Sequence, residues 1–371
     1  MINFLRGVPA DESLEKISPL VAEGYKEAIN KYGATVLQYG HFGGFKPLRD
    51  ILGEIYNTDP ERIIAGNGGL EVISLFFKSL PPNSTIIVEE ATYDRVLLDA
   101  MQYGHKVVGV EMTSEGVNSD DLERLLREIP AGSAKVFYGI PFHQNPTGIT
   151  YTEENRKAVE EICGKQDAIC AWDVCYESLR YDGNKNTPIE VSDGGPILMS
   201  SFTKTISPGT KCGYMVLPKE MIGHVTNVIA NTRINPNLPT QAFIAEFIKS
   251  GKYDEFQNVL CDLYKPRMDA LNTAMEAHFS ETDPVRATGG FSVLLNMPEI
   301  TEEKEDLFVK SAKEAGVSIG SASAVFAPNI LEKNRGKGFF VRTPFPALEP
   351  EQIGQGIATL KEVKQSVIGG L

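Results

Sequence analysis

The 371-residue sequence lacks the features of several classes of protein. It contains no uninterrupted apolar run of the roughly 18 residues that a membrane-spanning helix needs. Its first residues, MINFLRGVPADESLEK, show no basic segment followed by an apolar stretch, so no secretory signal is predicted. No run rich in Lys and Arg is present, and the formal net charge is -13. Nucleic acids and anionic membranes need a basic surface, so we expect neither as a partner.

Cysteine is scarce and scattered. The chain has five cysteines, which are Cys163, Cys170, Cys175, Cys212 and Cys261. An odd number spread through a long chain differs from the dense, even sets of small secreted domains. Their spacing also matches no metal-ligand motif, so no metal is predicted. We expect reduced thiols in a soluble, cytoplasmic protein.

Length and composition favour a large packed fold. Hydrophobic residues make up 42% of the chain and charged residues 23%, which is ordinary for a globular protein. A chain of this length usually exceeds one compact core, so two domains, or one large domain with a smaller one attached, are expected.

Strand-like and helix-like segments alternate through the middle of the sequence. Short runs rich in β-branched residues lie at 85–90, 106–111, 135–140, 168–173, 196–201 and 212–217. Between them, the apolar spacing of 93–104, 119–129 and 152–165 predicts amphipathic helices. This alternation predicts βαβ units and an α/β fold with a mostly parallel, mixed sheet.

The pattern changes beyond about residue 265, where a smaller α+β unit is expected. The first forty residues precede the regular alternation and are assigned to the same unit. The sequence therefore predicts a large domain over 41–264 and a small domain built from 1–40 and 265–371.

The polar residues best suited to chemistry follow predicted strands. Asn145 comes after 135–140, Asp173 ends 168–173, and Ser201 and Lys204 come at or just after the end of 196–201. Ligands of parallel sheets bind beyond the carboxyl ends of the strands, so one pocket is expected to gather all four.

Lys204 lies in the segment SSFTKTISPGTKCGYMV. Taken alone, a lysine in a loop rich in Ser and Thr is typical of a solvated surface residue. The segment, however, resembles the Schiff-base signature of the class I/II aminotransferases, which are fold type I enzymes dependent on pyridoxal 5′-phosphate (PLP). In that family the lysine follows Ser-x-Ser and precedes Pro-Gly, a basic residue and Gly.

Other segments resemble the same family in the same order. They are Y-G-x-x-x-G-x-x-P-L-R from Tyr39, A-T-Y at 91–93, Q-N-P-T-G at 144–148, W-D-x-x-Y at 172–176 and V-R-T at 341–343. The resemblance covers roughly residues 30–345 and implies a PLP enzyme with Lys204 as the Schiff-base lysine.

The resemblance assigns a role to each residue around the cofactor ring. Asp173 pairs with the protonated pyridine nitrogen, Asn145 and Tyr176 donate to the phenolate oxygen, and Tyr93 lies against the ring face. Each also has a plain alternative. Asn145 belongs to a segment rich in turn formers, Asp173 suits a helix N-cap, and the tyrosines suit ordinary packing.

The phosphate end departs from the family pattern. A Gly-rich segment predicts backbone donors at a helix N-terminus. The residues expected to hold the phosphate are Gly68, Gly69, Leu70, Ser201, Thr203 and Lys211. Lys211 stands where the family usually has Arg, which replaces a two-pronged donor by a compact charge, or else it is a solvated lysine. Tyr39 is implied to reach across a dimer interface to the phosphate.

Arg342 resembles the arginine that binds the α-carboxylate of the substrate in this family. Gly7 and Asn145 are expected to add donors to the same carboxylate. His41 follows Tyr39 and occupies a place from which relatives contact the substrate, although a lone His is often simply solvated. An edge-strand arginine on the surface is the alternative for Arg342.

These observations predict a PLP-dependent aminotransferase that acts on an α-amino acid and a keto acid as a homodimer. A PLP-dependent lyase, cyclase or oxidase of specialised amino-acid biosynthesis is the alternative on the same fold. A PLP-sensing regulator is a more distant alternative, because such regulators carry a DNA-binding module ahead of the segment that this sequence resembles.

Overall fold

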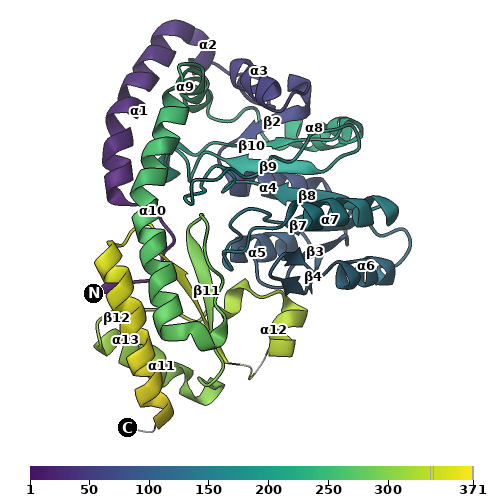
Figure 1. Ribbon diagram of the computed structural model, residues 1–371. Helices are drawn as coiled ribbons and strands as arrows, with labels where there is room; N and C mark the ends of the chain where they lie inside the picture. Colours follow the sequence, from purple (N-terminus) through teal and green to yellow (C-terminus); the bar gives the residue numbers. More distant parts are fainter. Residues whose placement is uncertain (335, 337, 370–371) are drawn as a thin grey trace.

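The computed structural model describes residues 1–334, 336 and 338–369 (Figure 1). Its centre is a seven-stranded sheet in which β10 is antiparallel to both of its neighbours and the other strands are parallel. In spatial order the strands are β2 (Ile63–Gly66), β10 (Gly213–Val216), β9 (Ile197–Ser201), β8 (Ile169–Asp173), β7 (Lys135–Gly139), β3 (Thr85–Glu89) and β4 (Lys106–Val110). The predicted α/β class with a mostly parallel, mixed sheet is confirmed.

The central strands read as continuous hydrophobic runs because both faces of the sheet are covered. β3 is buried at every position, as are β2 and β10. All six predicted strands are present with ends shifted by one residue at most. The edge strand β2 was not predicted, because four residues ending in Gly give too short a pattern.

Helices pack against this sheet, and some of them begin at a side-chain cap. The Asn118 side chain accepts the backbone N–H groups of Asp120 and Asp121 at the start of α6 (Ser119–Glu128). The Thr152 side chain accepts the Asn155 N–H in the same way at α7 (Glu153–Lys165). The other helices of this part are α3 (Lys46–Ile55), α4 (Gly69–Ser79), α5 (Asp94–Gln102), α8 (Ile222–Ala230) and α9 (Leu238–Lys249). A two-stranded ribbon, β5 (Met112–Thr113) and β6 (Gly116–Val117), precedes α6.

A smaller part lies at the lower left of Figure 1, where both chain ends are found. It contains the antiparallel pair β11 (Ser292–Met297) and β13 (Phe339–Pro344), and the parallel pair β1 (Ile2–Asn3) and β12 (Val317–Ser318). Its helices are α11 (Glu302–Glu314), α12 (Pro328–Asn334) and α13 (Pro350–Gly369), and the long α10 (Lys252–Phe279) joins it to the sheet.

The N-terminal segment touches both parts of the molecule. β1 pairs with β12 in the smaller part, whereas α1 (Asp11–Tyr32) and α2 (Ala34–Leu37) pack against α9 beside the sheet. α10 passes residue 264 without a break. The division at 41–264 therefore stays a prediction.

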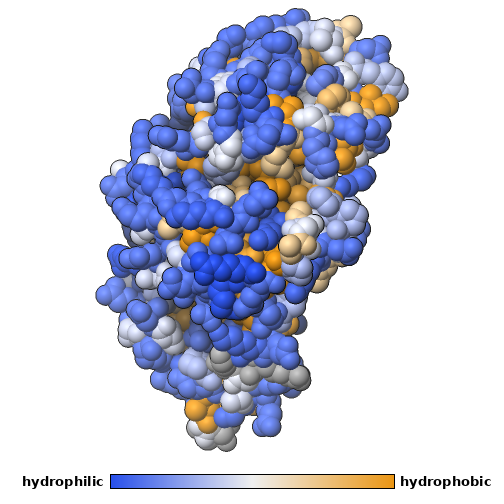
Figure 2. Space-filling model, turned by 90° about the vertical axis from the view of Figure 1, so that its right-hand side faces the viewer, coloured by the Kyte–Doolittle hydropathy of each residue, from blue (hydrophilic) through white to orange (hydrophobic). Residues whose placement is uncertain are grey.

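One face of the molecule is shown in Figure 2. It is mainly hydrophilic, with hydrophobic side chains gathered in its central and upper right parts. Among the helices that the structure describes, none is long and apolar enough to cross a membrane.

Candidate active site

A cavity of about 670 Å³ lies at the carboxyl ends of the sheet strands. It gathers the residues predicted for the phosphate, which are Gly68, Gly69, Leu70, Ser201, Thr203 and Lys211. It also gathers those predicted for the ring, which are Tyr93, Asn145, Asp173, Tyr176 and Lys204. Gly7 and Arg342, predicted for the substrate, also line it. Most of the predicted residues therefore meet in one place.

Tyr39 and His41 do not line this cavity within the single chain. The Tyr39 side chain is 76% exposed. His41 is exposed, its ring lies 4.2 Å from that of Phe42, and its Nδ1 accepts the Gly43 N–H at 3.1 Å.

Lys204 lies in the turn that follows β9 and faces the cavity. Its Nζ is 3.4 Å from the Gly7 carbonyl oxygen and 5.1 Å from the centre of the Phe291 ring. Burial lowers the pKa of Lys204, and the charge of Arg342 acts in the same direction. A lowered pKa leaves more of the amine neutral, which is the form that attacks a carbonyl group.

Asp173 ends β8 and is buried beside the cavity. Its Oδ2 accepts the Tyr138 hydroxyl at 2.8 Å, and its Oδ1 accepts the Cys175 N–H at 3.1 Å. Burial raises the pKa of Asp173, and these two hydrogen bonds act in the opposite direction. Tyr138 was missed in the sequence, because a tyrosine within a buried strand carries no signal that separates it from packing.

Asn145 reaches the cavity on a tight turn after β7. The Gly148 N–H donates to the Gln144 carbonyl oxygen at 2.7 Å, and the peptide bond before Pro146 is cis. The segment is therefore a turn, as its content of turn-forming residues predicted. This turn carries Asn145 to the cavity. Its Oδ1 lies 3.4 Å from Nη1 of Arg342.

Two tyrosines flank the same space. Tyr176 is buried with its ring centre 5.8 Å from that of Phe291, and burial raises its pKa well above the usual value. Tyr93 is half-buried and is the N-cap residue of α5. Both phenols stay protonated at neutral pH and can donate hydrogen bonds.

The phosphate end is built around the start of α4. Gly68 precedes this helix with φ of 111°. The first N–H groups of a helix have no intrahelical partner, and at α4 no side chain caps them either. The packing is tight, because a Cβ added at Gly213 would lie 2.6 Å from the Gly68 carbonyl carbon. The Ser201 hydroxyl donates to Thr203 Oγ1 at 2.6 Å, and exposed Lys211 borders the same space.

Arg342 projects from β13 and is only loosely bonded. Its Nη2 lies 3.4 Å from the Leu5 carbonyl oxygen. The distance from its Nη1 to Asn145 Oδ1 is the same, and both are long for hydrogen bonds. A Cβ added at Gly7 would lie 3.8 Å from the guanidinium carbon. The guanidinium therefore keeps donors for an anionic ligand.

Several lining residues were not predicted. They include Arg6, Arg95, Cys175 and Phe291. Arg6 and Arg95 are exposed at the cavity, where a charged residue is hard to tell from any other surface residue in the sequence.

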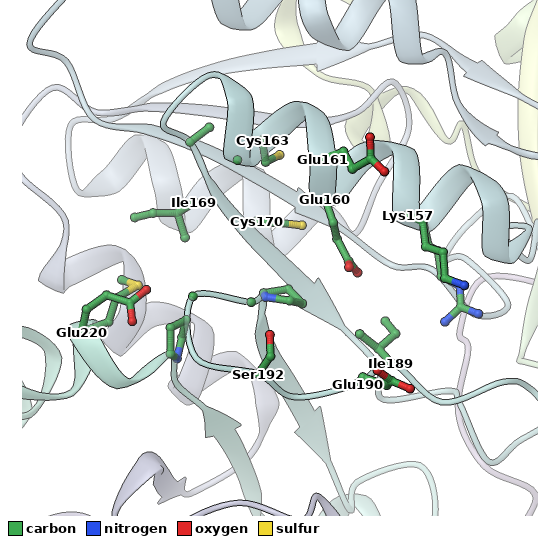
Figure 3. Close-up of a pocket in the computed structure, with 18 of the residues that line it drawn as sticks. Lys157, Glu160, Glu161, Cys163, Ile169, Cys170, Ile189, Glu190, Ser192 and Glu220 are labelled. Carbon is green, nitrogen blue, oxygen red and sulfur yellow. The ribbon is translucent and has the colours of Figure 1, made fainter.

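A larger cavity of about 760 Å³ lies at the opposite end of β8 (Figure 3). Acidic side chains and two thiols line it, among them Glu160, Cys163, Cys170, Glu190 and Glu220. None of the predicted site residues lies there, so size alone does not locate the chemistry. Among the described residues, no group of three or more His, Cys, Asp or Glu side chains is placed to hold a metal ion.

Residues 1–356 match the family model described as Aminotransferase class I and II. The chain belongs to this family. Among solved structures, the chain is similar to that of Pyrococcus horikoshii kynurenine aminotransferase in complex with PMP, with a TM-score of 0.87 and 25% identity. That match covers 99% of this chain and 91% of the other.

Two curated relatives are also enzymes that transfer amino groups. Aromatic-amino-acid aminotransferase 1 of Thermococcus litoralis is 29% identical, with 98% of this chain and 87% of the relative covered. The 2-aminoadipate transaminase of Thermus thermophilus is 26% identical, with 97% and 89% covered. The predicted family, fold type and enzyme class are confirmed, and the chain is a PLP-dependent aminotransferase acting on amino acids.

Proposed function

We propose that PLP binds in the cavity beyond β8 and β9 and that Lys204 forms the Schiff base with it. The observation that carries this proposal is the Lys204 amine, held 3.4 Å from a single carbonyl oxygen in a cavity that also contains a buried carboxylate, Asp173. Lys204 is half-buried, and a lysine withdrawn from water normally has an anionic partner. The Lys204 amine makes no close ion pair among the described residues, so it is available to react with the carbonyl group of a ligand.

The residues present fit the cofactor. PLP, when bound, supplies an aldehyde that condenses with amines and a pyridinium ring that takes up the electron pair left at the substrate α-carbon. Asp173 would hold the proton on the pyridine nitrogen, because a buried carboxylate with two hydrogen bonds favours a cation beside it. Asn145 and Tyr176 would donate to the phenolate oxygen, with Tyr93 along the ring face.

The start of α4 would hold the phosphate. The unpartnered N–H groups at Gly69 and Leu70 suit an anion at the positive end of a helix. Ser201, Thr203 and Lys211 would add hydroxyl groups and one positive charge.

Arg342 would hold the α-carboxylate of the amino acid, with Gly7 and Asn145 beside it. This fixes the α-carbon near Lys204. When the substrate amine takes the place of Lys204, the freed Lys204 amine would be the base that removes the proton from the α-carbon. In net terms the amino acid would become its keto acid, and a second keto acid would receive the amino group.

We also propose that the active form is a homodimer of the cytoplasm. Tyr39 would then reach the phosphate of the partner subunit, and His41 would approach its substrate. Supporting this, Leu37 and Ile234 are 68% and 63% exposed, which leaves apolar surface near Tyr39 in the single chain.

Single-turnover absorption spectra test the proposed function. The purified protein is mixed first with a panel of amino acids and then with keto acids. We expect amino acids to convert the bound cofactor to its aminated form and keto acids to convert it back. Release of ammonia without any aminated cofactor would contradict transamination by this site, and would favour the lyase alternative.

A further inference from the structure

Glu89 is a fully buried carboxylate outside the cavity, and it accepts four hydrogen bonds. Its Oε1 accepts the Ile140 N–H and the Tyr151 hydroxyl, both at 2.7 Å. Its Oε2 accepts the Gln144 amide at 2.7 Å and the Thr92 hydroxyl at 2.9 Å. None of these four partners is a cation. In these bonds the ionised form of Glu89 is stabilised by neutral donors.

Two of the four donors are sequence neighbours of the residues with the proposed ring contacts. Thr92 directly precedes Tyr93 at the start of α5, and Gln144 directly precedes Asn145. Each donor is therefore one residue away from a side chain that faces the cavity.

Gln144 also ties these loops to each other. Its amide nitrogen donates to the Ala91 carbonyl oxygen at 2.7 Å as well as to Glu89. Its Oε1 accepts the backbone N–H of Thr147 at 2.9 Å and the Thr147 hydroxyl at 2.7 Å. The orientation that Glu89 imposes on the Gln144 amide thus fixes both the turn at 144–148 and its distance from residue 91.

The hydrogen-bond pattern favours a carboxylate at this position. Two carboxylate oxygens offer about four acceptor positions, and all four are used. A glutamine at this place has only one acceptor oxygen, and its NH₂ group would point its protons at two donors. Burial raises the pKa of Glu89 to about 7, while the four donors act in the opposite direction.

We propose that Glu89 is a positioning residue that sets the places of Tyr93 and Asn145 relative to each other. This rests on the proposed function, in which these two side chains contact the cofactor ring. Glu89 itself does not line the cavity and acts only through Thr92 and Gln144.

The test uses Glu89→Gln, which keeps the size of the side chain and loses the acceptor pattern. Thr92→Val is a second variant that removes one bond to the Tyr93 loop and preserves shape. Tyr151→Phe is the matched control, because it also removes one buried hydrogen bond to Glu89, but from a residue that lies six positions beyond Asn145 in the stretch between β7 and α7. Circular dichroism confirms that each full-length variant is folded.

Two readouts report on the ring contacts. They are the dissociation constant of PLP for the apoprotein and the pH midpoint of the visible band of the bound cofactor. We expect Glu89→Gln to weaken PLP binding by about tenfold and Thr92→Val by about threefold, each with a shifted pH midpoint. Tyr151→Phe is expected to keep the wild-type midpoint even if its stability falls.

The proposal is overturned if folded Thr92→Val and Glu89→Gln keep the wild-type midpoint and PLP affinity. It is also overturned if Tyr151→Phe shifts both readouts as much as Glu89→Gln, because the effect would then be general loss of packing. If Glu89→Gln does not fold, Thr92→Val decides. Failure of the wild type itself to bind PLP would instead contradict the proposed function.

Discussion

The Tyr138 hydroxyl donates a 2.8 Å hydrogen bond to Oδ2 of Asp173. The two residues lie on the neighbouring parallel strands β7 and β8, and both are buried. Burial favours the neutral form of Asp173, whereas this hydrogen bond favours the carboxylate that the proposed pyridinium contact needs. Tyr138 thus supports the charge of Asp173 from behind the cavity.

Tyr138→Phe is expected to raise the pKa of Asp173 further and to weaken its hold on the protonated ring. Loss of one hydrogen bond to a buried charge is worth about 1.5–3 kcal/mol, so kcat should fall by at least about tenfold. Steady-state kinetics with a saturating amino acid measure this. Tyr181→Phe is the control, since its buried hydroxyl donates to the Gly290 carbonyl oxygen instead. Equal losses in the two variants would contradict a specific role for Tyr138.

Lys211→Arg is expected to tighten PLP binding by about threefold, because a guanidinium offers two parallel donors to a phosphate. Equilibrium titration of the apoprotein gives the dissociation constant. The exposed Lys219 lies away from the cavity, so Lys219→Arg is the matched control. Equal PLP affinity in Lys211→Arg and in this control would contradict the proposed contact of Lys211 with the phosphate.

Arg342→Lys is expected to lower kcat/KM for amino acids by about 10- to 100-fold, because the two-pronged contact with the α-carboxylate is lost. PLP affinity should stay within about twofold of the wild type. Both are measured on the same preparation. The proposed role is wrong if PLP affinity collapses while kcat/KM for the loaded enzyme is unchanged.

His143 gives a prediction about stability and pH. Burial lowers its pKa to about 3 from 6.5, and Arg180 acts in the same direction. Between these values the unfolded chain binds a proton that the folded chain does not, so stability is lost as the pH falls below 6.5. The loss is up to about 1.4 kcal/mol per pH unit.

His143→Asn isolates this effect, because Asn tolerates the positive φ of 49° at this position. The raised pKa of Glu89 acts in the opposite sense, because it gives a gain of stability as the pH falls from about 7 towards 4.5. Glu89 is present in both the wild type and the variant, so the difference between the two proteins reports on His143. Free energies of unfolding in urea are compared for both proteins between about pH 7 and about pH 5. The wild type should lose more stability than the variant over this interval. Parallel curves would contradict a neutral, buried His143.

The sheet was predictable because its strands are uninterrupted apolar runs separated by amphipathic helices. Lys204, Asp173 and Asn145 were predictable because each ends or follows such a run and lies in a segment that resembles the family. Tyr138 and Glu89 were not, because their roles depend on which side chains meet across neighbouring strands. Tyr39 and His41 stay predictions, since their proposed contacts lie in a second subunit.

The most direct test of the account is chemical reduction of the purified holoenzyme with borohydride, followed by digestion and mass spectrometry. Reduction turns a Schiff base into a stable secondary amine and so marks the lysine that holds the cofactor. We predict that the phosphopyridoxyl group is found on Lys204 and is absent from that position after prior conversion of the cofactor by an amino acid. A label on Lys211 or another lysine, or no label on a protein that contains PLP, would contradict the account.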